Sequence, residues 1–120
     1  MRDLTRGGLA TALNELASSA QVTIHVEEAA IPVREDVRGA CELLGLDPLY
    51  VACEGRFVAI VPEAHRDKAL ALMRECSIST QAVVAGRVTE RSSGAVTLRS
   101  AIGAERILDL LSGEQLPRIC

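Results

Sequence analysis

The last residue of the chain, Cys120, is the residue best suited to nucleophilic chemistry. A thiolate is a soft nucleophile, and a cysteine at the end of a short tether can present its sulfur to another protein. The segment before it extends to roughly 23 Å, and Pro117 stiffens it. We predict that residues 113–120 form a mobile tail that works as a swinging arm. The alternative is a frayed terminus with an incidental cysteine.

Arg6, Gly7 and Gly8 form a second candidate site, directly ahead of a predicted helix. The two glycines allow backbone N–H groups to approach an anion at the positive end of the helix dipole, so this segment could contact a phosphate. The competing interpretation is that Thr5 caps the helix and the glycines only form its entry turn, and the pattern alone favours this interpretation. Because the chain has neither a Walker A loop nor G-x-G-x-x-G, the segment alone predicts no nucleotide site.

Glu54 is a candidate proton acceptor between two short apolar runs, where the chain is expected to turn. A carboxylate held there near a cleft could take up a proton during a reaction. Most carboxylates in turns are simply solvated, and without further context that interpretation is preferred. A role for Glu54 therefore depends on what the fold places beside it.

The other three cysteines, Cys41, Cys53 and Cys76, are widely spaced and form no C-x-x-C pair. The sequence therefore predicts no redox dithiol and no metal site, because neither histidine has a second ligand at metal spacing. All three cysteines fall on apolar faces of predicted helices or strands, where a thiol is unreactive. We expect only Cys120 to be freely accessible to a thiol reagent.

The elements that must position these residues alternate between helices and strands. A helix is predicted after Thr5, because leucines recur there at helical spacing. Residues 21–27 alternate apolar and polar side chains, which is typical of a half-exposed strand. A second helix is predicted from Pro32 to a C-cap at Gly45.

The second half of the chain shows shorter patterns. Two apolar runs, residues 49–53 and 57–61, predict an antiparallel hairpin, and a third helix is predicted to begin at Pro62 and Glu63. The remaining elements are strands at residues 80–88 and 95–99 around a turn at 92–94, and an element at residues 104–111 that fits a helix and a strand equally well. The predicted fold class is therefore α+β, with a mixed, largely antiparallel sheet and packed helices over residues 1–112.

The composition indicates one globular domain and excludes several partners. The chain has 120 residues, of which 48% are hydrophobic and 24% charged, enough for a single core. Aromatic residues make up only 2% and the net charge is -3, so neither base stacking nor phosphate attraction points to a nucleic acid. No apolar run has the length of a membrane span and Met1 begins no secretion signal, so we expect a cytoplasmic protein without a membrane partner.

Five segments together resemble one family, the hydrogenase maturation factors called HypE, which are related to aminoimidazole ribonucleotide synthetase and selenophosphate synthetase. They are Met1-Arg2-Asp3 with Thr5-Arg6-Gly7-Gly8-Leu9, Ala30-Ile31-Pro32-Val33, Cys41-Glu42-Leu43-Leu44-Gly45-Leu46-Asp47-Pro48-Leu49, Glu54-Gly55, and Leu116-Pro117-Arg118-Ile119-Cys120. The similarity covers essentially the whole chain and is to the C-terminal domain of the family. Its most specific motif is the terminal Pro-Arg-Ile-Cys.

The resemblance implies a role in making the cyanide ligands of nickel-iron hydrogenases. The carbamoyltransferase HypF would place a carbamoyl group on Cys120, ATP-dependent dehydration would convert it to a thiocyanate, and the cyanide would pass to iron on the HypC–HypD complex. Glu54 would act as the base, while Arg6, Gly7 and Gly8 would face the nucleotide phosphates. The chain departs from the family pattern at Leu4, where the family commonly has proline, and at Cys53, where it commonly has asparagine.

The resemblance also implies an N-terminal ATP-binding domain that forms most of a homodimer interface and is absent from this chain. We therefore expect ATP and Mg²⁺ as cofactors of the full-length enzyme, and no cofactor or activity for this chain alone. Two alternatives stay open: a non-catalytic docking module for maturation partners, and a purine-type member of the same superfamily.

Overall fold

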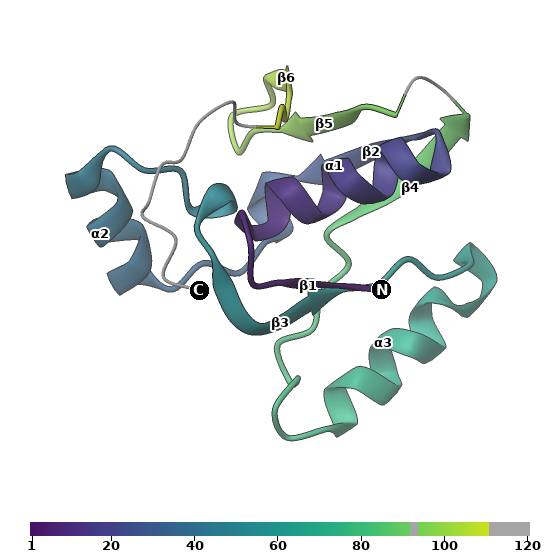
Figure 1. Cartoon of the computed structure of the whole chain (residues 1–120). Helices are drawn as coiled ribbons and strands as arrows, with labels where there is room; N and C mark the ends of the chain where they lie inside the picture. Colours follow the sequence, from purple (N-terminus) through teal and green to yellow (C-terminus); the bar gives the residue numbers. More distant parts are fainter. Residues whose placement is uncertain (92–93, 111–120) are drawn as a thin grey trace.

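The computed structural model describes residues 1–91 and 94–110 of the chain (Figure 1). Their elements, with η for a short 3-10 helix, are in chain order β1 (Arg2–Leu4), α1 (Gly8–Ala20), β2 (Val22–Glu27), η1 (Glu28–Ala30), α2 (Glu35–Leu44), η2 (Pro48–Tyr50), β3 (Cys53–Val58), η3 (Glu63–His65), α3 (Arg66–Glu75), β4 (Gly86–Arg91), β5 (Val96–Arg99) and β6 (Glu105–Ile107). The predicted tail and Cys120 lie outside the described residues. None of the helices in these two ranges is both long and apolar enough to cross a membrane.

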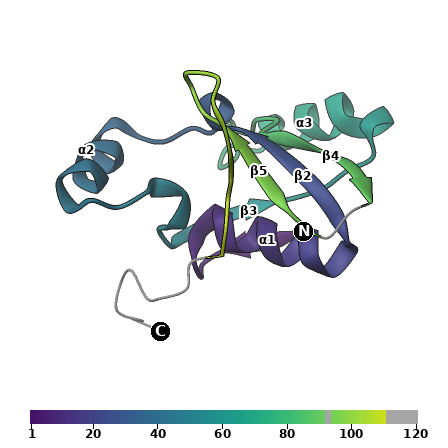
Figure 2. The same cartoon turned by 90° about the horizontal axis from the view of Figure 1, so that it is seen from above.

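The described strands form two sheets. The larger sheet has the order β4-β2-β5-β6, in which β2 pairs antiparallel with β4 and parallel with β5. The smaller sheet consists of the antiparallel strands β1 and β3. Helix α1 contacts both sheets and lies in the middle of the molecule (Figures 1 and 2). This arrangement confirms the predicted α+β class with a mixed sheet.

The hydrophobic core forms where α1 meets the larger sheet. Ala10, Leu13 and Ala17 of α1 are at most 4% exposed, and small side chains here let the helix approach the strands closely. The other members of the buried cluster are Ile24, Val26, Leu49, Val96, Leu98 and Leu108. Burial of a side chain such as Leu98 or Leu108 contributes about 2 kcal/mol to stability. The core thereby fixes α1 and the turn that precedes it.

The helix predicted after Thr5 is confirmed, but its first turn differs from the prediction. The N-cap of α1 is Gly7, which has a left-handed φ of 63° and forms no side-chain cap. The Thr5 N–H donates to Asp3 Oδ1 at 3.2 Å, which holds Thr5 in a turn ahead of the helix. Thr5 is therefore not the cap, because the aspartate side chain holds the chain in a turn before α1 starts.

The second predicted helix is confirmed with a later start. Helix α2 begins at Glu35 instead of Pro32, and it ends as predicted at Gly45, whose φ is 67°. Asp36, in the first turn, forms an ion pair with the extended residue Arg34 at 2.5 Å. Hydrogen bonds from Arg34 are the main reason why the pKa of the Asp36 carboxyl is lowered. Acidic residues suit the positive end of a helix dipole, which explains the observed start.

The hairpin predicted from residues 49–53 and 57–61 is wrong. Residues 48–50 form η2, because proline suits a first helical position and Asp47 Oδ1 accepts the Leu49 N–H at 2.9 Å. Cys53–Val58 is one strand, and its partner is β1 at the start of the chain. A three-residue strand is too short to show a periodicity, so the sequence contains no signal for this long-range pairing.

The last strands also differ from the prediction. The strand predicted at residues 80–88 begins only at Gly86, as β4. The residues before Gly86 turn back toward α3, where the Ala82 carbonyl accepts a hydrogen bond from Arg74 Nε at 2.9 Å. Strands β4 and β5 do not pair with each other, since β2 lies between them. Residues 104–111, which fit both patterns, contain the strand β6, paired with β5.

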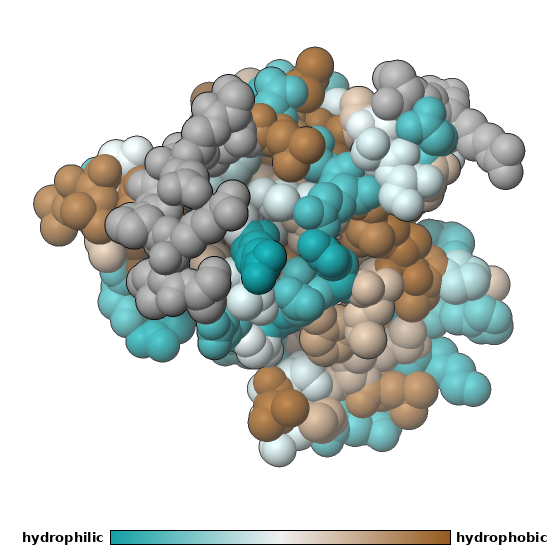
Figure 3. Space-filling model, viewed as in Figure 1, coloured by the Kyte–Doolittle hydropathy of each residue, from teal (hydrophilic) through white to brown (hydrophobic). Residues whose placement is uncertain are grey.

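The third predicted helix forms as η3 followed by α3, but its apolar face is not buried. No residue of α3 is buried, and Leu72 is 57% exposed. Figures 1 and 3 show α3 apart from the sheets, with hydrophobic residues around it. The segments before and after α3 add further exposed apolar residues, namely Phe57, Ile60, Val61, Ile78, Val83, Val84 and Val88. Together with Leu72 we call these residues the α3 face.

Candidate functional site

The pairing of β1 with β3 brings two of the predicted site segments together. Leu4 and Cys53 are cross-strand partners, so Glu54 follows directly after this pair on one strand and the turn with Arg6 follows it on the other. The two residues at which the chain departs from the family pattern are thus neighbours in the sheet. Leu4 is buried and Cys53 is partly buried, so both side chains contribute to the packing beneath the candidate site.

Glu54 lies in a bulge of β3. Asp3 pairs with Phe57 and the next residue, Leu4, pairs with Cys53, so residues 54–56 have no partner in β1. Gly55 has a φ of 73°, a value that glycine adopts without strain. The Glu54 side chain is exposed, and it forms no ion pair with any other described residue. The proton-accepting role predicted for Glu54 stays a prediction at this point.

The turn with Arg6 is held by the residues around it. Asp3 accepts the Thr5 N–H, and this hydrogen bond is the main reason why the pKa of the Asp3 carboxyl lies below its ordinary value. Arg2 forms an ion pair with Glu15 of α1 at 2.5 Å. Arg6 is exposed and forms no ion pair within residues 1–91 and 94–110. Its guanidinium therefore remains available to an anion.

The structure gives a reason, which the sequence did not reveal, why residues 7 and 8 are glycines. Gly7 and Gly8 both have a φ of 63°, and Gly8 packs on the backbone of the segment after Asp47. A Cβ on Gly8 would lie 2.5 Å from the Val51 carbonyl oxygen and 2.6 Å from that of Leu49. The need for glycine is therefore explained by packing. The phosphate contact expected at Arg6 stays a prediction, and the geometry of the two glycines shows only that the turn must be compact.

Replacing Gly8 with alanine should destabilise the fold by more than about 1 kcal/mol, because the new methyl group would overlap two carbonyl oxygens at a left-handed φ. Gly39 in α2 is the matched control, since a Cβ there meets no atom within 4 Å. Gly39→Ala should be neutral or stabilising by about 0.4–1 kcal/mol. Urea unfolding of both variants measures the difference. Equal stabilities would show that the turn is not held against η2.

The last described residues are tied to the same part of the molecule. Asn14 Nδ2 donates to the Leu108 carbonyl at 2.7 Å, and the Tyr50 hydroxyl donates to the Asp109 carbonyl at 2.8 Å. Arg106 pairs with Asp47 at 2.9 Å. Burial raises the pKa of the Tyr50 hydroxyl. These contacts fix residues 106–109 beside η2 and α1, the helix that begins directly after the turn with Arg6.

Sequence reasoning missed these anchoring residues. Asn14 is a polar residue inside an otherwise apolar helix face, and its amide also donates to the Ala10 carbonyl at 2.9 Å. Tyr50 is the only tyrosine of the chain. An amide in mid-helix and a lone tyrosine were the available signals, but their partners lie far away in the sequence.

The cysteines differ from one another in exposure. Cys41 is buried and Cys53 is partly buried, as expected for packing residues. Cys76 is exposed, so the expectation that only Cys120 is accessible is wrong. The physical reason is that α3 is uncovered and Cys76 lies just after its last residue. Among the described side chains, no three of His, Cys, Asp and Glu gather as metal ligands.

The family model "AIR synthase related protein, C-terminal domain" matches residues 1–99. The chain is 56% identical to the carbamoyl dehydratase HypE of Rhodobacter capsulatus over 119 residues, which cover 99% of this chain and 35% of that protein. It is 53% identical to the carbamoyl dehydratase HypE of Cupriavidus necator over 120 residues, which cover all of this chain and 34% of that protein. The chain therefore spans about a third of the length of these curated relatives.

Solved structures with the same fold include hydrogenase maturation protein HypE, with a TM-score of 0.90, 49% identity, and coverage of 99% of this chain and 39% of the other. HypE in complex with ATP matches with a TM-score of 0.89 and 48% identity over 99% of this chain and 37% of the other. The HypE–HypF complex matches with a TM-score of 0.83 and 38% identity over 90% of this chain and 35% of the other. We conclude that the chain belongs to the AIR synthase related family, as a C-terminal domain of the HypE type.

Proposed function

We propose that this chain is the C-terminal part of an ATP-dependent carbamoyl dehydratase that makes the cyanide ligands of nickel-iron hydrogenases. The observation that carries the proposal is the pairing of β1 with β3, which brings together the segments that carry Glu54 and Arg6, two exposed residues without an ion-pair partner among the described residues. The similarity to curated proteins called carbamoyl dehydratase HypE supports this assignment.

The proposed reaction takes place on the sulfur of Cys120. The Cys120 thiol loses its proton to a base, its sulfur forms a bond to the carbamoyl carbon of the donor, and the bond between that carbon and the donor's leaving group breaks. Dehydration then removes the amide oxygen and both nitrogen protons, which leaves a thiocyanate, S–C≡N. Sulfur is the suitable atom for this carrier because it is a strong nucleophile and later a good leaving group for cyanide.

Glu54 and Arg6 have complementary roles in this proposal. Amide oxygen is a poor leaving group, and ATP supplies the phosphoryl group that lets this oxygen leave as phosphate. Arg6 would neutralise charge on the phosphate oxygens, since a guanidinium binds them with two parallel hydrogen bonds. Glu54 would accept a nitrogen proton while the C≡N bond forms. Because Glu54 is exposed in the structure, the arriving tail would have to shield it from water during the reaction.

Residues 111–120 are long enough to deliver the thiol. They follow Leu110, which is next to Asp109, and the Asp109 carbonyl accepts a hydrogen bond from the Tyr50 hydroxyl. These ten residues extend to about 33 Å. Tyr50 lies four residues before Glu54, a separation of at most about 14 Å. The extended segment is therefore long enough to bring Cys120 to Glu54 and also to a partner protein that loads it.

The α3 face supports the presence of a further domain in the active protein. Eight large apolar side chains around α3 are more than a third exposed, which is unusual for an isolated soluble domain. We propose that a preceding ATP-binding domain covers them and supplies ligands for the nucleotide and for magnesium. Homodimerisation would also belong to that domain.

The partners follow from the reaction. A carbamoyltransferase of the HypF type would load Cys120, and the solved complex of HypE with HypF shows that a relative binds such a protein. A HypC–HypD type complex would receive the cyanide on iron. We place the reaction in the cytoplasm, where a terminal thiol stays reduced.

Calorimetry with ATP and magnesium tests whether ATP binding requires the preceding domain. The isolated chain should show no micromolar binding and no ATP turnover, because residues 1–91 and 94–110 offer a phosphate no more than one helix start with Arg6. The full-length protein, titrated in parallel, should bind ATP. Micromolar binding and turnover by the isolated chain would show that no second domain is required.

A further inference from the structure

The bulge of β3 carries a second charged residue besides Glu54. Residues 54–56 have no partner in β1, and the last of them is Arg56. Both charged side chains are exposed, and Arg56, like Glu54, forms no ion pair within the described part of the chain. Figure 3 shows mostly hydrophilic side chains where the small sheet lies in Figure 1. The bulge therefore presents one carboxylate and one guanidinium to solvent, and they do not pair with each other.

Gly55 keeps the two charged residues close together. Its φ of 73° lies in the left-handed region, and a Cβ at this position would meet no atom within 4 Å. Glycine therefore suits the backbone conformation here, and the space around it is open. Two residues span at most about 7 Å, which limits the distance between the Cα atoms of Glu54 and Arg56. A small group can thus approach both side chains at once.

The proposed dehydration needs a base and a cation side by side. The carbamoyl oxygen, which leaves, and the nitrogen, which loses its protons, are bonded to the same carbon, and about 2.2 Å separates them. A base must come within hydrogen-bonding distance of the nitrogen. A phosphoryl group on the oxygen is an anion, and a guanidinium binds it with charge-assisted hydrogen bonds. A carboxylate and a guanidinium in one three-residue bulge meet both requirements.

Arg6 approaches the site from a different direction. Strands β1 and β3 are antiparallel, so the chain beyond β1 continues toward residues that precede Cys53 and away from the bulge. Gly8 accordingly packs on the backbone of residues 49–51. Arg56, by contrast, lies within the bulge itself. Of the two arginines, it is therefore the one that shares a segment with the proposed base.

We propose that Arg56 binds the phosphoryl group on the carbamoyl oxygen and stabilises it as it leaves as phosphate. This inference rests on the function proposed above, in which ATP is the donor of that group. When the phosphoryl group is transferred, the carbamoyl oxygen forms a bond to the γ-phosphorus, the bond from the γ-phosphorus to ADP breaks, and one nitrogen proton passes to solvent.

The role of Arg56 falls in the step that follows. The C–O bond breaks with its electron pair on the leaving phosphate, the second nitrogen proton passes to Glu54, and the electrons of that N–H bond complete the C≡N bond. Negative charge grows on the leaving oxygen in this step, and a fixed cation beside it lowers the barrier.

The rate at which carbamoyl-loaded full-length protein forms thiocyanate tests the proposal. Arg56→Gln removes the charge and should lower the rate at saturating ATP about ten- to a hundredfold, the range for one hydrogen bond to a charged group. The ATP concentration that gives half the maximal rate should not change, because the proposed function assigns ATP binding to the preceding domain. Arg56→Lys keeps the charge and should recover part of the rate, although lysine cannot form two parallel hydrogen bonds.

Inorganic phosphate, a product of the reaction, provides a second readout that needs no turnover. Calorimetry with full-length protein that holds ADP and magnesium should show phosphate binding that Arg56→Gln weakens about tenfold. Urea unfolding should give the same stability for this variant and for the native protein, because Arg56 is exposed and makes no described ion pair.

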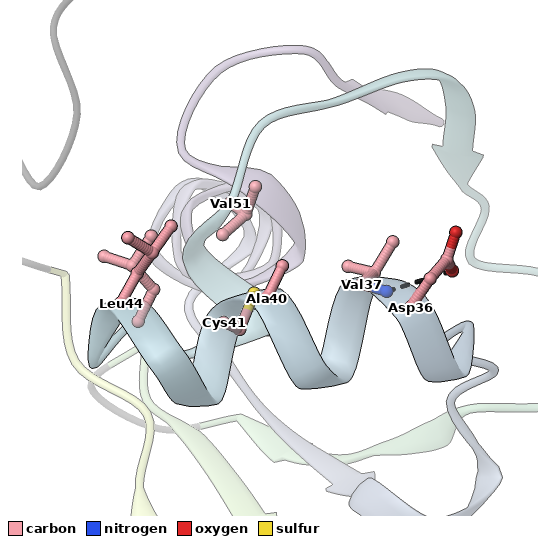
Figure 4. Close-up of a pocket in the computed structure, with 7 residues that line it drawn as sticks. Asp36, Val37, Ala40, Cys41, Leu44 and Val51 are labelled. Atoms are coloured by element: carbon pink, nitrogen blue, oxygen red, sulfur yellow. Dashed lines mark hydrogen bonds between the residues drawn. The ribbon is translucent and has the colours of Figure 1, made fainter.

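Arg38→Gln is the matched control for both readouts. Arg38 is also exposed and forms no ion pair with a described residue, but it lies in α2, which belongs to neither sheet. Its neighbours on this helix, Val37 and Ala40, line an apolar pocket to which the bulge of β3 does not contribute (Figure 4). The control should keep the native rate and the native affinity for phosphate.

The possible results separate this inference from the proposed function. If Arg56→Gln formed thiocyanate at the native rate, or bound phosphate with native affinity, the role of Arg56 would be refuted while the proposed function stood. Equal losses in the glutamine and lysine variants would also refute it, because the charge would then not matter. A change in the half-saturating ATP concentration alone would assign Arg56 to ATP binding and overturn the proposal. If the native protein formed no thiocyanate, the proposed function would fail, and the role of Arg56 with it.

Discussion

Replacement of Cys120 by alanine in the full-length protein should abolish carbamoyl acceptance while folding and ATP binding stay nearly unchanged. A hydroxyl or carboxylate cannot replace the sulfur, because each is a far weaker nucleophile toward a carbamoyl donor at neutral pH. Mass spectrometry after incubation with the carbamoyltransferase and its donor measures the effect. The variant should show no adduct.

Cys76→Ala is the matched control for this experiment. Cys76 is the exposed cysteine of the described chain, and it lies at the end of α3, outside the candidate site. Its replacement should leave carbamoyl acceptance unchanged. An adduct that persists in Cys120→Ala and disappears in Cys76→Ala would transfer the carrier role to α3.

Glu54→Gln should block dehydration and leave carbamoylation intact. Glutamine keeps the size of the side chain but cannot accept a proton, and loss of one general base lowers a rate by about 10² to 10⁴. The carbamoyl adduct on Cys120 should therefore accumulate in the presence of ATP, and Glu54→Asp should restore part of the rate. The measurement is the ratio of carbamoyl to thiocyanate adduct over time.

Glu75→Gln removes another exposed carboxylate, in α3, and should have no effect on this ratio. If Glu54→Gln formed thiocyanate at the normal rate, the base would have to lie in the ATP-binding domain. The bulge of β3 would then serve to shape the surface that the tail meets.

The parts of the fold that the sequence predicts are those whose signal is local. Helix α1 and strand β2 have clear periodicity, and Gly45 ends α2 where a left-handed residue is required. The pairing of β1 with β3 is different, because a three-residue strand joins a segment about fifty residues away. The apolar runs around Glu54 fit a hairpin just as well as the observed strand. Only the contact with Leu4 decides between them.

In the candidate site, too, some features have a local signal in the sequence and others depend on contacts between distant residues. Arg6 and Glu54 are visible as candidates in the sequence, but only the β1–β3 pairing brings the segments that carry them together, and this pairing has no local signal. The requirement for Gly8 comes from the carbonyls of η2 and the residue after it, which no pattern near Gly8 reveals. Likewise, Asn14 and Tyr50 acquire their role only where the last described residues return to α1.

The mass of the C-terminal peptide of the native full-length protein tests the central claim most directly. After incubation with the carbamoyltransferase and its donor, the peptide that ends in Cys120 should gain the mass of one carbamoyl group. After addition of ATP and magnesium, it should lose the mass of one water molecule, and fragmentation should place both changes on Cys120. A peptide that stays unmodified, or a modification on any other residue, would contradict the role of Cys120 as the carrier of the cyanide group.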